Sequence, residues 1–226
     1  MSRHASAPKT ESELLQRSRA LAGRTLGEIA ESVGVTIPQH SVHAKGFAGI
    51  LLEQVLGATA SSKPEPDFQL IGVELKSLPI DAGGKPREST YVCTVPLTNN
   101  HDMHWQTSTV RRKLARVLWM PILVERHAPI SARRIAMPII WSATPEQEAT
   151  LRQDWEELMD MVVLGELDKL SAHHGTWLQI RPKAADSKAR SRATTSSGAP
   201  NFALPKGFYL RASFTSMILK QHYALP

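Results

Sequence analysis

The chain contains only one cysteine, Cys93, among its 226 residues. A single cysteine excludes an internal disulfide and is typical of a protein from the reducing cytosol. No apolar run approaches the roughly 20 residues that a membrane-spanning helix needs. The N-terminal segment MSRHASAPKT is polar and lacks the apolar stretch of a signal peptide. We therefore expect a cytoplasmic protein with no membrane partner, in which residues 1–10 form a disordered tail.

Acidic residues are scarce in the last quarter of the chain. Residues 173–226 contain eight Lys and Arg residues but only one acidic residue, Asp186. Because the whole chain has a formal net charge of +6, the remainder is close to neutral. A basic segment on a near-neutral body favours a surface that binds a polyanion, although a solvated basic surface has the same composition. The 42% hydrophobic content suffices for one large domain or two closely coupled lobes.

Apolar spacing and turn residues predict an α/β protein with a sheet flanked by helices. Capping boxes mark helix starts at Thr25 and Thr144. Helices are expected at 11–33 (two short ones), 47–57, 108–116, 145–170 and from 214 to the C-terminal tail. Strands are expected at 71–78, 89–97, 117–124, 133–143, 176–183 and 207–214. The link 81–88 has hairpin chemistry, and the small, polar residues of 184–200 predict a mobile loop.

Two groups of reactive side chains are expected to have ordinary structural roles. Cys93 lies in the strand-like run TYVCTVPL, where a buried, small hydrophobic residue is expected rather than a nucleophile. The acidic residues of the 145–170 helix are expected on a solvated face rather than in a metal cluster. They are Asp154, Glu156, Glu157 and Asp160.

The segment KPEPDFQLIGVELKSLP, residues 63–79, has the residues for phosphodiester hydrolysis. In a strand, alternate residues face opposite sides, so Glu74 and Lys76 project together while Val73 and Leu75 face the other way. With Asp67 from the preceding turn, they can hold a divalent metal beside a phosphate. Hydrolysis of a phosphodiester needs such a metal, an activated water and a positioned phosphate.

Each of these side chains has a role in that interpretation. Asp67 and Glu74 supply hard oxygen ligands that suit Mg²⁺, and Lys76 can orient the water or bind the phosphate. Glu53, on the preceding predicted helix, can join as a third acid, and Lys113, on the basic helix, can reach the same phosphate. The spacing alone leaves two alternatives open: a metal site, or an exposed salt bridge between Glu74 and Lys76.

Several blocks of the sequence, in order, resemble the MutH family of mismatch-repair endonucleases. The resemblance extends from about residue 11 to residue 222 and is far more specific than the acidic residues and lysine alone. The blocks are GILLEQVLGA, SSKPEPDFQLIGVELKSLP, STYVCTVPL, VRRKLARVLWMPI, DWEELMDMVVLGELDKLSAHHGTWLQIRPKAA and LPKGFYLRASFTS.

The resemblance implies a fold and an activity. The fold would be that of type II restriction endonucleases, a mixed sheet flanked by helices with two arms around a DNA cleft. The enzyme would nick the unmethylated strand of hemimethylated or unmethylated GATC, 5′ to the G, with Mg²⁺, for which Mn²⁺ or Ca²⁺ can substitute in binding. MutL would activate it and couple it indirectly to MutS. It would act on double-stranded DNA as a monomer, in the cytoplasm of a bacterium, associated with the nucleoid through DNA.

The resemblance also implies roles for particular residues. Its catalytic set maps onto Asp67, Glu74 and Lys76, with Glu53 as the additional acid and Lys113 as the additional lysine. Its DNA-contacting residues map onto Arg181, Pro182 and Lys183, and Tyr209 matches a tyrosine linked to sensing adenine methylation. Tyr91 stands where the family has a phenylalanine.

These matches imply one endonuclease domain over residues 11–226, with catalytic residues mainly in 45–120 and recognition residues mainly in 175–215. Two other functions remain as alternatives. One is a restriction endonuclease that cuts both strands of GATC, and the other is a DNA-binding module without catalysis. Because the chain contains one such catalytic set, a double cut would need two copies or two sequential nicks.

Overall fold

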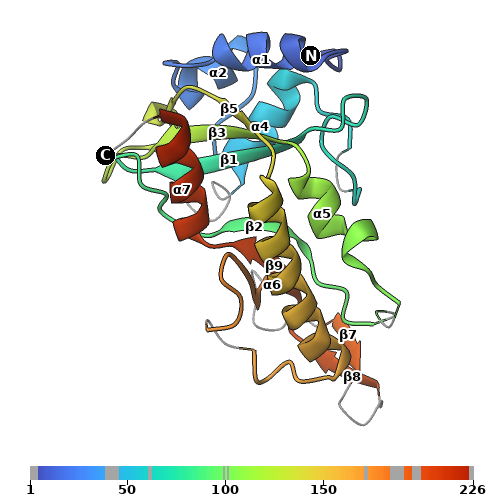
Figure 1. The fold of residues 1–226 in the computed structure, drawn as a ribbon. Helices are drawn as coiled ribbons and strands as arrows, with labels where there is room; N and C mark the ends of the chain where they lie inside the picture. Colours follow the sequence, from blue (N-terminus) through green and yellow to red (C-terminus); the bar gives the residue numbers. More distant parts are fainter. Residues whose placement is uncertain are drawn as a thin grey trace. The chain divides into compact units, whose positions relative to one another are not determined.

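The structure is a computed structural model that describes residues 5–38, 46–60, 63–98, 100, 102–170, 173–183, 191–194 and 200–223. The chain divides into two compact units, and it passes between them several times (Figure 1). The first unit comprises Met1–Glu88, Ala115–Ser142 and Ile218–Pro226, and the second comprises Ser89–Leu114 and Ala143–Met217. The segment 45–120, in which catalytic residues were predicted, is therefore shared between the units. Among the described helices, none has the length and apolar character that crossing a membrane requires.

The first unit contains a mixed sheet of four strands: β1 (Glu74–Ile80), β3 (Val117–Leu123), β4 (Arg134–Ile135) and β5 (Ile139–Trp141). β1 runs parallel to β3, with Glu74 opposite Val117, whereas β4 and β5 are antiparallel to β3. The apolar run of β3 is buried along nearly its whole length, as expected of a central strand covered on both faces. The predicted mixed sheet is confirmed.

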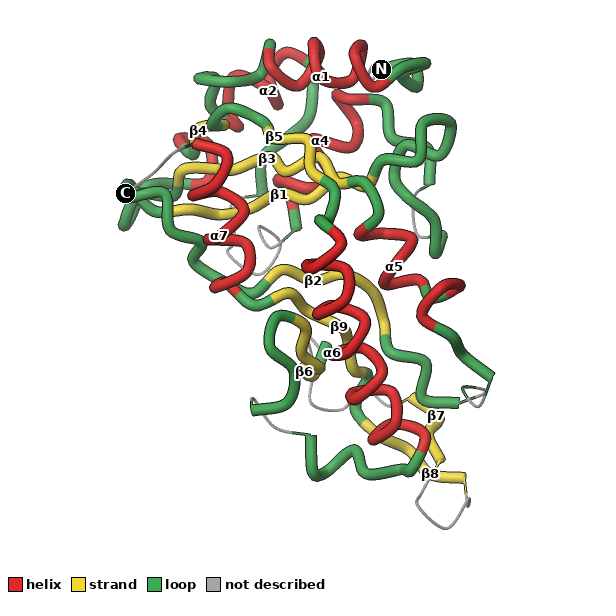
Figure 2. Tube along the Cα trace, in the orientation of Figure 1, coloured by secondary structure: helices red, strands yellow, loops and turns green. Residues whose placement is uncertain are grey.

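Three helices pack on one face of this sheet: α1 (Glu11–Arg19), α2 (Leu26–Ser32) and α4 (Phe47–Leu56) (Figures 1 and 2). The predicted capping box at Thr25 is present, and it satisfies backbone N–H groups that the first turn of a helix leaves unpaired. The shared core contains Leu14, Leu26, Leu51, Val73, Leu75, Leu118 and Met120. Because Val73 and Leu75 face this core, Glu74 and Lys76 project from the opposite face of β1.

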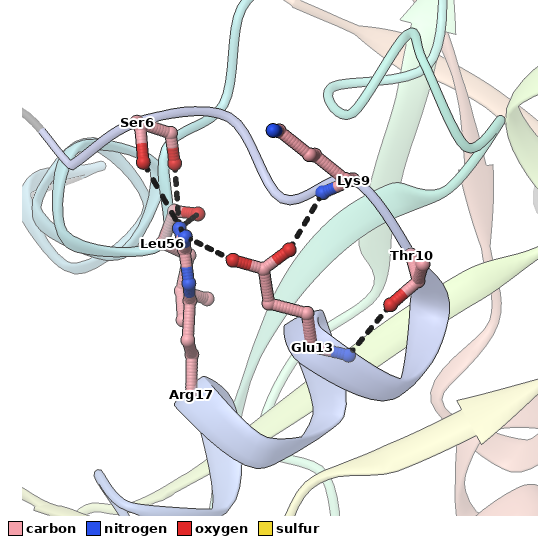
Figure 3. A network of polar contacts seen from close by, with 6 residues as sticks. All are labelled: Ser6, Lys9, Thr10, Glu13, Arg17 and Leu56. Atoms are coloured by element: carbon pink, nitrogen blue, oxygen red, sulfur yellow. Dashed lines mark hydrogen bonds and ion pairs between the residues drawn. The ribbon is translucent and has the colours of Figure 1, made fainter.

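The N-terminal segment is anchored to the first unit from Ala5 onward (Figure 3). Arg17 donates hydrogen bonds to the carbonyl oxygens of Ser6 (2.5 Å) and of Leu56, at the end of α4 (3.3 Å). Arg17 also pairs with Glu13, which accepts a hydrogen bond from the backbone of Lys9. The predicted disordered tail is therefore wrong for residues 5–10, and residues 1–4 lie outside the described chain.

The second unit contains an antiparallel sheet in the order β2 (Thr90–Thr94), β9 (Lys206–Leu210) and β6 (Leu178–Pro182). It also contains the helices α5 (Thr109–Leu114) and α6 (Pro145–Val163), with a short 3-10 helix η1 (Trp105–Thr107) before α5. A second 3-10 helix, η2 (Ile130–Ala132), belongs to the first unit, and α7 (Ala212–Tyr223) ends the described chain.

Two local predictions are wrong, and a third is right only in part. The link 81–88 does turn as a short hairpin, in which Ile80 forms an antiparallel bridge with Pro86 and Arg87 donates its backbone N–H to Pro79 (2.9 Å). β1 nevertheless pairs with β3 and β2 with β9, so this hairpin does not pair β1 with β2. α6 ends at Val163 rather than near 170, because Gly165 adopts a left-handed conformation (φ 70°) that terminates helices. Within the predicted loop 184–200, β7 (Ser191–Thr194) pairs with β8 (Pro200–Ala203); residues 184–190 and 195–199 lie outside the described chain.

Candidate active site and candidate nucleic-acid interface

Glu74 and Lys76 form a buried ion pair at the start of β1. The Lys76 Nζ atom lies 2.7 Å from Glu74 Oε1, and the Glu74 side chain is only 1% exposed. The backbone N–H of Glu74 donates to the carbonyl oxygen of Arg116, which fixes the end of the strand. Burial removes both charges from water at a high cost, and a protein recovers that cost only through close pairing or bound ligands. The salt bridge that the sequence left open is therefore present, but it is largely buried rather than exposed.

Asp67 is brought to the same end of β1 by a tight reversal of the chain. Phe68 and Val73 exchange backbone hydrogen bonds across this turn, and Gly72 has the positive φ (66°) that the reversal requires. The carboxylate of Asp67 accepts a hydrogen bond of 2.8 Å from the backbone N–H of Leu75, the residue after Glu74. Asp67 is itself 7% exposed, so two nearly buried acids lie at one strand end.

Two carboxylates at this position fit a hard divalent cation. Mg²⁺ prefers oxygen ligands and keeps several waters, so it is usually bound by one or two carboxylates together with phosphate oxygens. Within the described part of the chain, no group of three or more His, Cys, Asp or Glu side chains is placed to hold a metal. Glu53 lies on α4, which packs against β1, but its part as a third acid stays a prediction.

Lys113 lies on the predicted basic helix, α5, in the second unit. The hydroxyl of Ser108 accepts a hydrogen bond from the backbone N–H of Arg111 (3.1 Å), so Ser108 caps the start of this helix. Arg111 in turn pairs with Glu148 of α6 at 2.7 Å, and this pairing lowers the pKa of the Glu148 carboxyl. The approach of Lys113 to a phosphate stays a prediction.

The predicted DNA-contacting residues come together on the sheet of the second unit. Tyr91 of β2 lies opposite Tyr209 of β9, and their rings meet edge to face with centroids 5.4 Å apart. The guanidinium of Arg181 lies 5.8 Å from the centre of the Tyr209 ring. The ammonium of Lys183 lies 4.5 Å from the centre of the Tyr91 ring. Pro182, between them, pairs with Lys206 of β9. Cations over aromatic rings combine the charge and the flat surfaces that nucleic acids bind.

Sequence reasoning missed two residues of this surface, Gly207 and Thr94. A Cβ atom on Gly207 would lie 2.8 Å from the ring of Tyr91 and 3.0 Å from that of Tyr209, so only glycine leaves the two rings this close to the strand. The hydroxyl of Thr94 lies 2.9 Å from the hydroxyl of Tyr91 and accepts a hydrogen bond of 3.1 Å from Lys183. A glycine inside a strand is the one signal that the sequence offered for this arrangement.

Of the two reactive groups that were expected to have ordinary structural roles, one is placed as predicted and the other is not. Cys93 is buried, as predicted. Asp154, which was expected on a solvated helix face, is instead 3% exposed. Its carboxylate accepts hydrogen bonds from the backbone N–H groups of Thr176, Trp177 and Leu178 at 2.7–2.8 Å. Asp154 therefore holds the start of β6, the strand that carries Arg181.

Comparison with known proteins shows that this chain is similar to DNA mismatch repair proteins over nearly its full length. A family model described as "DNA mismatch repair enzyme MutH" matches residues 56–154. The DNA mismatch repair protein MutH of Serratia proteamaculans (strain 568) is 52% identical over 216 residues, which cover 96% of this chain and 95% of that protein. The MutH protein of Escherichia coli (strain K12) is 50% identical over 220 residues, covering 97% of this chain and 96% of its own length. The resemblance indicated by the sequence blocks is confirmed over nearly the full chain.

Proposed function

Because the chain belongs to the MutH family of DNA mismatch repair enzymes, we propose that it is a Mg²⁺-dependent endonuclease. It nicks the unmethylated strand of hemimethylated or unmethylated GATC sites, 5′ to the G. The observation that carries this proposal is the convergence of Asp67, Glu74 and Lys76 at the start of β1.

Each residue of this set has a proposed role. Asp67 and Glu74 hold the metal, which, when bound, neutralises charge that develops on the phosphate and makes its water more acidic. Lys76, already 2.7 Å from Glu74, orients the attacking water or holds a phosphate oxygen. Glu53 and Lys113 are proposed as the additional acid and the additional phosphate-binding cation. Mn²⁺ or Ca²⁺ would substitute for Mg²⁺ in binding.

Sequence recognition is assigned to the second unit. Arg181 and Lys183 can donate hydrogen bonds to guanine O6 and N7 in the major groove. The Tyr209 ring is proposed to pack against the methyl group of one methylated adenine, and a second methyl group would overfill that site. Tyr91 and Pro182 complete the contact surface, and the cation–aromatic pairs described above support this assignment.

Partners and location follow from the same proposal. The chain would act as a monomer on double-stranded DNA containing GATC, in the cytoplasm of a bacterium and at the nucleoid through its DNA. MutL would activate it, and MutS would act on it indirectly through MutL.

A nicking assay with Glu74→Gln tests the proposal. The substitution keeps the size of the side chain but removes its charge, so nicking of a hemimethylated GATC duplex in Mg²⁺ should fall by at least about 100-fold. Duplex binding, measured in Ca²⁺, should persist. Glu156→Gln is the matched control, because Glu156 forms a solvent-exposed pair with Arg152 on α6 and should leave nicking unchanged. Undiminished nicking by Glu74→Gln would remove this residue from the active site.

The same assay separates the alternative functions. An unmethylated duplex should be nicked, and a hemimethylated duplex should be nicked in its unmethylated strand. A fully methylated duplex should not be cut. Cleavage of both strands in a single encounter would favour a restriction endonuclease. Binding without any metal-dependent nicking would indicate a DNA-binding module without catalysis.

A further inference from the structure

Thr94 occupies the centre of a small polar network on the β2–β9–β6 sheet of the second unit. Its hydroxyl oxygen accepts a hydrogen bond of 3.1 Å from the Lys183 ammonium and lies 2.9 Å from the Tyr91 hydroxyl. Lys183 also lies over the Tyr91 ring, 4.5 Å from its centre. The three side chains therefore form a closed triangle, in which each one contacts the other two.

The backbone of the sheet brings these side chains together from different strands. A register shift between Tyr91 and Cys93 marks a bulge in β2, which places Thr94 on the same face as Tyr91. Thr94 lies opposite Gly207 of β9, while Lys183 follows β6 on the far side of β9 and donates its backbone N–H to Pro205 (2.7 Å). Because Gly207 has no side chain, the Lys183 side chain can cross β9 and reach Thr94.

The chemistry of the triangle restrains the lysine. A free lysine side chain loses rotamer entropy when a ligand orders it, so a lysine that is already ordered binds with a smaller loss. An ammonium has three N–H donors, and the Thr94 oxygen takes only one of them. The other two N–H donors of the ammonium can bond to an acceptor on a ligand.

We propose that Thr94, together with the Tyr91 hydroxyl, is a positioning residue that holds the Lys183 ammonium in place to donate to acceptors on a DNA duplex. This inference rests on the proposed function. It also gives a role to the hydroxyl that distinguishes Tyr91 from the phenylalanine that the sequence resemblance leads one to expect. Thr94 acts through Lys183 and needs no contact of its own with the DNA.

Binding of a fluorescently labelled, hemimethylated GATC duplex, without Mg²⁺ to prevent cleavage, tests the role of Thr94. Thr94→Val removes the hydroxyl but keeps the shape, and it should raise the Kd about threefold to tenfold, because one hydrogen bond to a charged group is lost at a partly solvated site. Thr94→Ser keeps the hydroxyl and should restore binding to within about twofold. Thr150→Val is the matched control, since the Thr150 hydroxyl donates to the Glu146 carbonyl oxygen of its own helix, α6.

A double-mutant cycle with Lys183→Met distinguishes positioning from a general loss of structure. If Thr94 acts through Lys183, Thr94→Val should add almost no further loss once the ammonium is gone. An equal loss of affinity in both backgrounds would overturn the proposal, and so would wild-type binding by Thr94→Val. Should Thr94→Val fail to fold, the same cycle with Tyr91→Phe, which removes only the second hydroxyl, gives the coupling.

The salt dependence of binding separates this inference from the proposed function. Thr94→Val removes no charge and should keep the wild-type slope of log Kd against log salt, whereas Lys183→Met should reduce it by about 0.9 if the lysine contacts a phosphate. A wild-type chain that does not prefer the GATC duplex to a scrambled one overturns the proposed recognition, and this inference with it. If the wild type prefers the GATC duplex but the losses of affinity from Thr94→Val and Lys183→Met are additive, only the positioning role of Thr94 is overturned.

Discussion

The two units of the molecule hold their key lysines by different physical means. In the first unit, Lys76 pairs with a carboxylate that is 1% exposed. In the second, Lys183 is exposed and lies against a tyrosine ring and a threonine hydroxyl, and no acidic residue of the described chain forms an ion pair with it. The buried pair is sensitive to the loss of either charge, whereas an exposed cation over a ring can lose its partners at little cost to folding. The comparison teaches that the lysine proposed for catalysis, Lys76, and the lysine proposed for DNA binding, Lys183, have different surroundings.

The largest expected effect would break the pairing in the first unit. Lys76→Met leaves the Glu74 carboxylate buried without its cation, which should destabilise the fold by about 3–5 kcal/mol in addition to abolishing nicking. Urea denaturation and the nicking assay measure the two effects. Lys169→Met removes the partner of an exposed pair with Glu166 and should change stability by less than about 1 kcal/mol. Similar stability losses for these two variants would contradict the view that burial decides the outcome.

A smaller effect is expected where each unit brings a glycine close to a neighbour. A Cβ on Gly57, at φ 83°, would lie 2.3 Å from the Ser6 carbonyl oxygen, and neither backbone can easily move. Gly57→Ala should therefore cost about 2–4 kcal/mol of stability. At Gly207 the neighbours are the edges of two rings, so Gly207→Ala should cost only about 1 kcal/mol but weaken duplex binding.

Thermal denaturation and duplex binding, measured on both glycine variants, test this contrast. Gly23→Ala is the control for Gly57→Ala, because Gly23 has the same φ of 83° with no atom within 4 Å of the added Cβ. The difference in stability between these two variants measures the clash with the Ser6 carbonyl oxygen separately from the strain of a positive φ. Gly207→Ala would contradict the comparison if it bound duplex DNA as tightly as the wild type.

The smallest expected effect concerns one arginine–carboxylate pair in each unit. Hydrogen bonding to Arg116 lowers the pKa of Glu11, and hydrogen bonding to Arg111 lowers the pKa of Glu148, each from its usual 4.5. A lowered pKa in the folded state means that the pair stabilises the fold above about pH 4.5. This stabilisation disappears as pH falls through the lowered pKa of the folded state.

Glu11→Gln and Glu148→Gln should therefore lose stability near neutral pH and approach the wild type in acid. Because these side chains are more than a third exposed, each loss should stay below about 1 kcal/mol and shrink in high salt. Urea midpoints across the acidic range measure this change. A loss that is the same at every pH would show that lost packing, rather than charge, accounts for the effect.

Features that depend on neighbouring residues could be predicted from the sequence. The capping boxes at Thr25 and Thr144 are present as expected, because each joins side chains three residues apart. The alternation of Glu74 and Lys76 against Val73 and Leu75 is also confirmed, because the period of a strand is local. The functional set was predicted by resemblance to a family, and that family is confirmed.

Features that depend on distant partners could not be predicted. The turn at Asp81, whose carboxylate accepts hydrogen bonds from the backbone of Gly83 and Lys85, looks like a hairpin turn locally. β1 nevertheless pairs with β3, from residues 117–123, and the strand that follows the turn, β2, pairs with β9 near the end of the chain. Asp154 was misplaced for the same reason, since the backbone amides that surround it come from residues 176–178.

The sequence by itself determined the family of this protein, its helix starts and the projection of Glu74 and Lys76 from one face of a strand. Only the tertiary structure decided that this pair is buried, that Asp67 is held against the backbone of Leu75, and that residues 5–10 are anchored. It also decided the network around Thr94. A regular strand would place Tyr91 and Thr94 on opposite faces, and the bulge that reunites them is specified by pairing with β9 rather than by the residues of β2 alone.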